Sequence, residues 1–528
     1  MRNRRPIHFQ SNEASAIAVM KRIGYLGLDV GGTGAKAGVV DGSGRLLAGA
    51  RRPFQPTLSA EGHVEIPIET IYNAAREAAL AAIRKSRARV VALSIGSQGQ
   101  TFVSLDQRDE PLHPAIVWYD ARAAEEAQRL RSTLQSAGLR EPLPPITSLS
   151  TVPKIIWLRR RRPALMAQAR RYLLLPDYFA YRLTGRAVTD PCTASSTGVY
   201  AEDTPDYCGA ALAAAALEKG QLAEIQCTGQ PIGPVRPEMA AAWGLPPETL
   251  VVTGTNDQYA GALGAGNCRP GIVSVTIGTC LALVTLSERL PAPLPAGLWG
   301  GRFPITRYQF ALAYAKTAGV VLEWFQRELS AGKSLPELDQ LAAGVPAGSR
   351  GIVAFPHFDG MISPEPDPAA RGAFLGLSLH HTSADLHRAL LESLGFCLRD
   401  NLDFLRRCGF HIAAIRAMGG AARSDLLMQI AADIAGEPIE RPRLTESAVL
   451  GAAMIAAAGA GNFSSLEECS AALYAPERIF APDPGRSLLY TELYPRYVAL
   501  YRRVYQHQMS EAGTRSRGKD RGDAKQSE

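Results

Sequence analysis

The sequence has no paired cysteines. Its eight cysteines are scattered singly over 528 residues, with no C-x-x-C motif and no histidine at metal-ligand spacing. A structural zinc site usually needs ligands at such spacing, so the sequence argues against one. We expect reduced thiols that bind no metal, as in a cytosolic protein.

Long apolar runs are missing as well. No run approaches the ~18 to 20 residues of a membrane span. The longest candidates, such as GAAMIAAAGAG at 451–461, are short and consist largely of alanine and glycine. The N-terminus carries arginines but lacks the continuous apolar stretch of a secretory signal. We therefore expect no membrane partner and predict a cytoplasmic location.

Excess charge is scarce outside the two ends of the chain. The net charge is +7, but residues 1–22 carry five Arg or Lys against one Glu, and the last eighteen residues carry five against four. The ends thus supply five of the seven net charges, which leaves a nearly neutral body and argues against a nucleic acid partner. The internal run RRRR at 159–162 is read as a solvated helix end, with a phosphate patch as the alternative.

The chain is too long for one hydrophobic core, so two domains of roughly 200 to 250 residues are expected. The patterns predict a strand hairpin at 23–52, a helix at 68–84 and a buried strand at 89–96, which indicates a mixed α/β domain. A second hairpin at 271–286 also carries Gly-Thr at its turn, as two related halves would. The predicted segments are a disordered extension at 1–22, domains at 23–267 and 268–505, and a disordered tail at 506–528.

The stretch VVTGTNDQYAGALGAG, residues 251–266, ends an apolar run on one carboxylate and continues in very small residues. An acid at the end of a buried strand occupies a rigid, partly desolvated position. The small residues allow the following helix to pack close to its neighbour. Asp257 is therefore predicted to be a fixed hydrogen-bond acceptor, and the alternative is a cap for a helix that begins near Gln258.

The first glycine turn lies in GLDVGGTGAK, residues 27–36. It is neither a Walker A loop nor a G-x-G-x-x-G dinucleotide turn. Its bare backbone amides and the Thr33 hydroxyl could approach a phosphate, with Asp29 available to hold hydrated Mg²⁺. The alternative is an ordinary hairpin turn.

Two further glycine turns follow the same logic. IGTC at 277–280 offers the amide and hydroxyl of Thr279 after Gly278. MGGAARSDLLMQ at 418–429 places two glycines ahead of a helix, whose free N–H groups suit a nucleotide. Alone, each is better explained as an ordinary feature, IGTC as a strand turn, in which Gly-Thr is common, and MGGAARSDLLMQ as a helix entry.

The order of these pieces is more informative than any one of them. From about Tyr25 to Gly461 the chain resembles the FGGY family of carbohydrate kinases, with the motifs in the family's order. The resemblance implies two ribonuclease-H-like α/β domains of the actin/hexokinase/sugar-kinase superfamily, which close an interdomain cleft on ATP and a sugar. The motifs are DVGGT, WYDAR, LLPDYFAYRLTGRAVTD, GTNDQ, IGTC, ARGAFLGLSLHHTSADLHRALLES and MGGAARSDLLMQIAADIAGEPIE.

The resemblance also implies roles for single residues. Asp257 matches the base that takes the proton from the sugar hydroxyl, and Asp29 matches the Mg²⁺ site. Lys36 is also compatible with a solvated side chain on a strand. The residues expected around ATP are Gly32, Thr33, Lys36, Gly278, Thr279, Gly319, Gly419, Gly420 and Ser424.

The sugar side is expected around SQGQT and WYDAR. Gln98 and Gln100 offer primary amides to sugar hydroxyls. Trp118 could lie against the C–H face of a sugar, with Asp120 and Arg122 as polar contacts or as an ion pair. The Met-His pair that follows Gly-Gln in xylulose kinases and the Arg-Glu pair of glycerol kinases are both absent, because Gly99-Gln100 occupies the corresponding region.

We therefore expect ATP-dependent phosphorylation of a hydroxyl group of a small sugar, with a pentulose such as xylulose favoured. The alternatives are a kinase for gluconate, an L-ketose or a glycerol-like polyol, and a catalytically silent sugar or nucleotide sensor. An actin-like chaperone would need a large peptide-binding domain, but only about seventy residues follow Gly461. ATP and the sugar are the expected partners, and a homodimer is left open.

Overall fold

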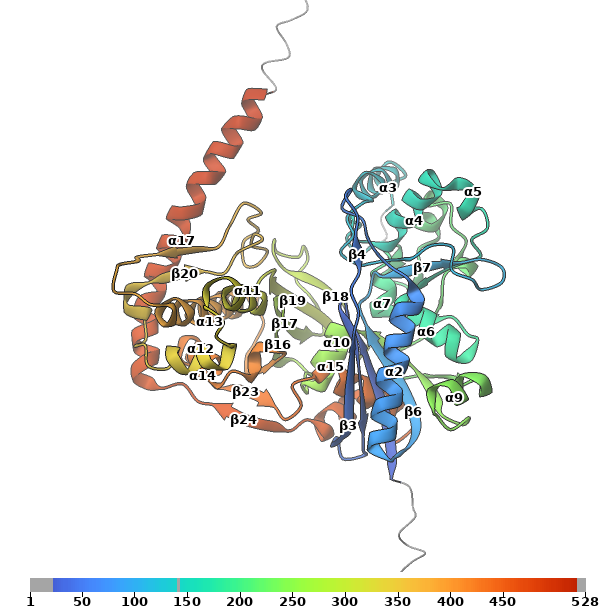
Figure 1. Ribbon diagram of the computed structural model, residues 1–528. Coiled ribbons are helices and arrows are strands. Elements are labelled where there is room, and N and C mark those ends of the chain that lie inside the picture. Colours follow the sequence, from blue (N-terminus) through green and yellow to red (C-terminus); the bar gives the residue numbers. More distant parts are fainter. Residues whose placement is uncertain (1–21, 140–142, 520–528) are drawn as a thin grey trace, which may run out of the picture.

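The computed structural model describes residues 22–139 and 143–519, with side chains as far as residue 505. Apart from Arg22, the predicted extension lies outside the described residues, as does 520–528 of the predicted tail. Helix α17 (Pro484–Lys519) continues past residue 505 into the range predicted to be a tail. Figure 1 shows this helix running along the C-terminal domain and beyond it.

The first domain contains a six-stranded sheet in the order β14-β15-β6-β1-β2-β3. Strands β1, β2 and β3 form an antiparallel meander; β6 pairs with β1 in parallel, and β15 pairs with β6 in parallel. The predicted hairpin and helix are confirmed. The bounds are β1 (Ile23–Val30), β2 (Gly34–Val40), β3 (Leu46–Pro53), α2 (Ile68–Ser86), β6 (Arg89–Ser97), β14 (Pro231–Pro234) and β15 (Leu250–Asn256).

The second domain repeats this arrangement in a seven-stranded sheet, β18-β19-β17-β16-β22-β23-β24. The β16-β17 hairpin again begins an antiparallel meander, and β22 and β23 add in parallel. Both halves are thus ribonuclease-H-like, which confirms the predicted fold. The bounds are β16 (Gly271–Ile277), β17 (Leu281–Ser287), β18 (Trp299–Arg302), β19 (Gln309–Ala315), β22 (Ile412–Met418), β23 (Ile439–Pro442) and β24 (Pro476–Phe480).

A smaller lobe projects from the first domain (Figure 1). Its five-stranded sheet has the order β4-β5-β8-β7-β9 and shares a separate apolar core with α3, α4 and α8. The sequence patterns did not predict this lobe. Its elements are β4 (Thr57–Leu58), β5 (Val64–Ile66), β7 (Phe102–Leu105), β8 (Ala115–Ile116), α3 (Ala124–Ser136), α4 (Thr151–Arg161), α5 (Pro163–Met166), β9 (Arg171–Leu174) and α8 (Gly209–Ala214).

The remaining helices cover the two large sheets. Helices α2, α6 and α9 pack on the first sheet, and α13, α14 and α17 share the main core of the second. Their bounds, with those of the shorter elements, are α6 (Leu175–Thr184), β10 (Val188–Thr189), α7 (Pro191–Ser195), β11 (Tyr200–Ala201), β12 (Asp206–Tyr207), β13 (Glu224–Ile225), α9 (Pro237–Trp243), α11 (Gly319–Leu329), α12 (Leu335–Ala342), β20 (Val353–Phe355), β21 (Ala373–Leu375), α13 (Ser383–Arg407), α14 (Asp425–Ala435) and α16 (Leu466–Leu473). Within the part of the chain that is described, no helix is long and apolar enough to cross a membrane.

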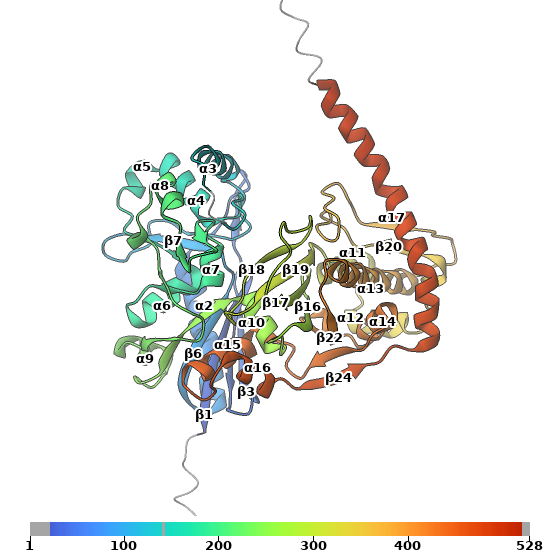
Figure 2. The same ribbon diagram turned by 180° about the vertical axis from the view of Figure 1, so that it is seen from behind.

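Two helices cross where the domains meet, α10 (Asp257–Gly264) and α15 (Ser447–Gly459). A Cβ atom on Gly264 would collide with the Ser447 carbonyl, and one on Gly451 would collide with the Ala260 carbonyl. The small residues after Asp257 therefore let two backbones touch. Although α15 belongs to the second half of the sequence, it packs on strands β1 and β6 of the first sheet (Figure 2).

Candidate active site

A cavity of ≈ 130 Å³ opens where the two halves of the chain meet. It lies at the carboxyl ends of β1 and β15, beside β16 and β22, the usual position of ligands in such sheets. The structure thus brings four predicted site residues to one place: Asp29, Lys36, Asp257 and Gly419. The full lining is Asp29, Lys36, Asp257, Gln258, Gly261, Thr276, Met418, Gly419, Thr445, Glu446, Ser447 and Ala448.

Asp257 is the first residue of α10, directly after β15 ends. The helix is capped by its neighbour Asn256, whose side-chain oxygen accepts a hydrogen bond from the Gln258 amide at 2.9 Å. The alternative that Asp257 is the cap is therefore wrong. Its carboxylate is partly buried and lines the cavity.

Two acids share this cavity and disfavour each other's charge. Burial raises the pKa of Asp257 from 3.8 to about 7, and the negative charge of Asp29 adds to the effect. Burial also raises the pKa of Asp29, while the Lys36 ammonium 3.7 Å away opposes that rise. A carboxylate poised near neutral pH suits a group that must accept a proton.

The raised pKa of Asp257 predicts a pH-dependent cost in stability. The carboxyl is stabilised in its protonated form, so its contribution to folding is present below the unfolded pKa and is lost as pH rises through about 7. In the variant Asp257→Asn the side chain at this position carries no ionisable group. We expect its Tm to exceed that of the wild type at pH 8 by more than at pH 5, as measured by calorimetry. A Tm difference that is constant over this range would contradict the assignment.

The first glycine turn faces the sugar-side residues. Thr33 is exposed at its tip, and the Gly31 amide donates to the Gly34 carbonyl at 3.1 Å. A Cβ atom on Gly32 would lie 3.6 Å from Gln98 Oε1 and 3.8 Å from Trp118 Nε1. The predicted phosphate turn and the predicted sugar residues are therefore neighbours.

The second and third glycine turns meet each other. The Gly319 amide donates to the Gly278 carbonyl at 2.7 Å, and the Thr279 carbonyl accepts from Ala318 at 2.8 Å. Gly419 has a φ of +95°, and a Cβ atom there would lie 2.7 Å from the Ile277 carbonyl. Only glycine fits this approach. By contrast, a Cβ atom on Gly278 or Gly420 would meet no described atom within 4 Å, so there is open space beside these two glycines.

Two predicted nucleotide residues, Gly420 and Ser424, lie just ahead of helix α14. The Ser424 hydroxyl caps α14 by accepting from the Leu427 amide at 3.0 Å, and it donates to Asp339 at 2.5 Å. The hydroxyl proton of Ser424 is thus committed to Asp339, and one lone pair is left to accept a hydrogen bond from a nucleotide. Gly420 is exposed and directly precedes the short 3₁₀ turn Ala421–Arg423.

The sugar side has an open acceptor and an aromatic pair. Gln98 is buried, and its Oε1 has no hydrogen-bond partner among the described residues. Trp118 is 38% exposed and meets Tyr119 edge to face at 5.3 Å. Tyr119 was not predicted, although its place beside Trp118 in WYDAR is a usable signal. Gln100 is partly buried, and its backbone carbonyl accepts a hydrogen bond from the Thr151 hydroxyl.

Asp120 and Arg122 do not face the cleft, so the prediction that they contact the sugar requires correction. Both side chains are almost fully buried. One Asp120 oxygen accepts from the backbone and side chain of Arg122, and the other accepts from the Val64 amide at 2.6 Å and from Arg122. The predicted ion pair between Asp120 and Arg122 is present, and it is buried within the protein.

Sequence reasoning missed Glu446 and Gln258. Glu446 forms an ion pair with Lys36 and another with Arg423, so Lys36 is not an isolated solvated side chain. Gln258 Oε1 is buried without a partner among the described residues and lies beside Asp257. Glu446 is almost two hundred residues from Asp257, so no local pattern relates them.

The acids fit a magnesium ion shared with a ligand. No group of three or more His, Cys, Asp or Glu side chains in the described ranges could hold a metal by itself. Mg²⁺ usually takes one or two carboxylates and completes its shell with phosphate and water. A cation would also offset the repulsion between Asp29 and Asp257.

A larger cavity of ≈ 510 Å³ lies elsewhere, between α13, α17 and the segment 357–367. Its lining includes four tyrosines of α17 and none of the glycine turns. The smaller cavity combines acids, a cation and bare backbone, as phosphate chemistry requires.

The comparisons with known proteins agree with this geometry. The model of the FGGY carbohydrate kinase N-terminal domain matches residues 24–264, and that of the C-terminal domain matches 273–460. A xylulose kinase from Staphylococcus epidermidis is 26% identical over 491 residues, 91% of this chain and 97% of that protein. A glycerol kinase from Geobacter sp. (strain M21) is 32% identical over 483 residues, 88% of this chain and 95% of that protein.

A solved structure extends the similarity to three dimensions. The ligand-bound xylulose kinase from Lactobacillus acidophilus matches with a TM-score of 0.81 at 25% identity, covering 91% of this chain and 98% of that chain. The two domain matches together span most of the sequence, in the order in which the two related sheets occur. The chain therefore belongs to the FGGY family of carbohydrate kinases.

Proposed function

We propose that this kinase transfers the γ-phosphoryl group of ATP to a hydroxyl of a pentulose, with xylulose as the first candidate. The observation that carries the proposal is that Asp29, Lys36, Asp257 and Gly419 line one interdomain cavity. A silent sensor would not need a partly buried acid whose pKa is about 7 beside an open cavity.

In the proposed reaction, Asp257 accepts the proton of the sugar hydroxyl as its oxygen attacks the γ-phosphorus and ADP leaves. Phosphoryl transfer has a loose transition state, so positioning and charge neutralisation matter more than covalent chemistry. Lys36, which lies on β2, would neutralise negative charge on the phosphates. The amides around Gly278 and Gly419 would face the nucleotide. Mg²⁺, held through Asp29, would supply neutralisation of the phosphate oxygens.

The substrate class rests on the chemistry of the sugar side and on the relatives. The unpaired Gln98 oxygen offers an acceptor to a hydroxyl, and Trp118 with Tyr119 offers apolar faces to C–H groups. Two of the three relatives described above are named xylulose kinases and one a glycerol kinase. A polyol is therefore the second candidate.

A cytoplasmic location and a homodimer stay predictions.

A coupled ADP-release assay tests the substrate. The panel should contain D-xylulose, D-ribulose, L-ketoses, gluconate and glycerol, each at several concentrations with Mg-ATP. We expect the highest kcat/KM with a pentulose. A higher value with glycerol or gluconate would reassign the substrate, and no sugar-dependent ADP release would contradict the proposed function.

A further inference from the structure

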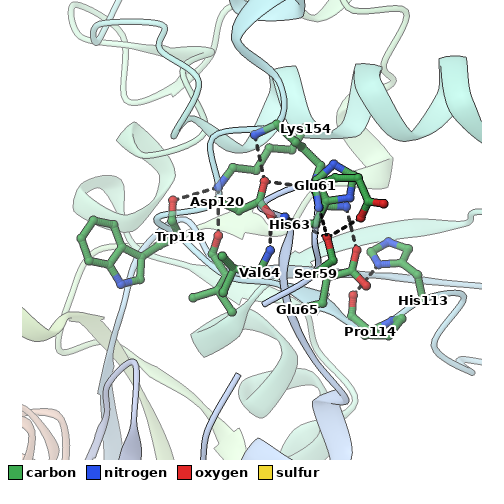
Figure 3. A network of polar contacts seen from close by, with 12 residues as sticks. Ser59, Glu61, His63, Val64, Glu65, His113, Pro114, Trp118, Asp120 and Lys154 are labelled. Atoms are coloured by element: carbon green, nitrogen blue, oxygen red, sulfur yellow. Dashed lines mark hydrogen bonds and ion pairs between the residues drawn. The ribbon is translucent and has the colours of Figure 1, made fainter. Parts of the chain in front are cut away.

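A lysine lies fully buried behind the sugar-side loop. Lys154 is in α4, and its ammonium donates to the carbonyls of Val117 at 3.2 Å and Trp118 at 2.9 Å (Figure 3). No carboxylate among the described residues forms an ion pair with it. Both of these hydrogen bonds therefore go to the backbone of one loop.

Burying an ammonium without a direct counter-ion costs free energy. Burial lowers the pKa of Lys154 to about 7, and the charge of nearby Asp120 only partly opposes this. An apolar side chain of similar length would fill the same space at lower cost. The position of Lys154 therefore suggests a task that needs its hydrogen bonds.

The two carbonyls belong to the segment that carries the exposed aromatic pair. The Trp118 amide donates to Thr101 Oγ1 at 2.9 Å, so the backbone of Trp118 is held from both sides. Its indole points away from the polar cluster in Figure 3, and its Nε1 faces the Gly32 turn. Losing Lys154 would leave the Trp118 carbonyl without this partner and free the segment to shift.

The same face of α4 supports the loop a second time. Trp157, one turn after Lys154, lies under the Arg122 guanidinium at 4.9 Å and meets His63 edge to face at 5.2 Å. Arg122 in turn binds Asp120 and Glu65. The loop thus rests on a polar layer that is fixed by α4.

We propose that Lys154 is a positioning residue: it holds Trp118 and Tyr119 against the Gly32 turn, where they bind the sugar. This inference rests on the proposed function, since it takes the aromatic pair to be the sugar platform. Lys154 itself need not touch the substrate.

The variant Lys154→Met tests the proposal. We expect the KM for the sugar to rise by about tenfold or more, because small misplacements of binding groups are costly. The KM for ATP and sugar-independent ATP hydrolysis should change by less than about twofold. If the methionine variant does not fold, Lys154→Gln is used; its shorter amide cannot reach both carbonyls, so the same change is expected.

Arg159→Met is the matched control. Arg159 lies on the same helix and also donates to backbone and hydroxyl oxygens, but its partners are Ala216 and Tyr172, away from the loop. A loss of Tm without a rise in sugar KM is expected. Equal rises in sugar KM for both variants at matched Tm loss would overturn the proposal.

A readout independent of catalysis separates the two proposals. The chain has five tryptophans, so ¹⁹F spectra of protein labelled with 5-fluorotryptophan can be assigned for Trp118 with Trp118→Phe. Lys154→Met should shift or broaden that resonance, whereas Arg159→Met should not. An unchanged resonance overturns the positioning role. A shifted resonance in a protein that phosphorylates no sugar would keep the loop role and reject the proposed function.

Discussion

Replacing Asp257 with Asn is expected to lower kcat by on the order of 10² to 10⁴, the usual contribution of a positioned base. The carboxylate lines the interdomain cavity, and its pKa of about 7 allows it to accept a proton at neutral pH. The Kd for ATP should change little, because the nucleotide turns lie on other elements. Steady-state kinetics with the best sugar and calorimetry with a non-hydrolysable ATP analogue measure the two quantities.

Asp400→Asn is the matched control for this variant. Asp400 is another carboxyl whose pKa is raised by burial, to about 6, but it lies in α13 against Tyr494. Its replacement should leave kcat within about twofold of the wild type. An Asp257→Asn enzyme that keeps half of its activity would remove the proposed base.

Gly451→Ala is expected to destabilise the protein by about 3 kcal/mol or more, the upper end of the cost of overpacking. The added Cβ would collide with the Ala260 carbonyl, and a backbone atom cannot rotate away as a side chain can. Helices α10 and α15 would have to separate, which would also displace Asp257. Urea unfolding measures the stability, and kcat should fall with it.

Gly209→Ala serves as the comparison. Gly209 begins α8, is exposed, and has no other atom within 4 Å of an added Cβ. Alanine favours a helix over glycine, so unchanged or slightly higher stability is expected. Wild-type stability in Gly451→Ala would show that the helices do not cross as closely as described.

The sequence predicted those parts of the fold that depend on neighbouring residues. The strand hairpins at 23–52 and 271–286 and the helix at 68–84 were predicted from local periodicity and turn residues. Asp257 could be found because a strand end followed by small residues is a local signal. The two related sheets were implied by the resemblance of the motifs to the FGGY family, and the similarity of the two hairpins alone was too short to establish them.

The parts that were missed depend on contacts between distant residues. Glu446 reaches Lys36 only because α15 returns to the first sheet, and no spacing in the sequence encodes that return. Asp120 and Arg122 looked like ligand contacts because their motif is polar, but burial turned them toward each other. Lys154 gave no signal, since a lysine in a helix is usually solvated.

The return of α15 means that the chain does not divide cleanly at residue 267. A fragment that stops there would contain β1 and β6 but would lack the helix that covers them, so apolar side chains such as Tyr25 and Ala92 would be laid bare. The two halves are interleaved units. Their folding must therefore be coupled, and any rotation of one sheet against the other has to pivot around a helix that each of them helps to hold.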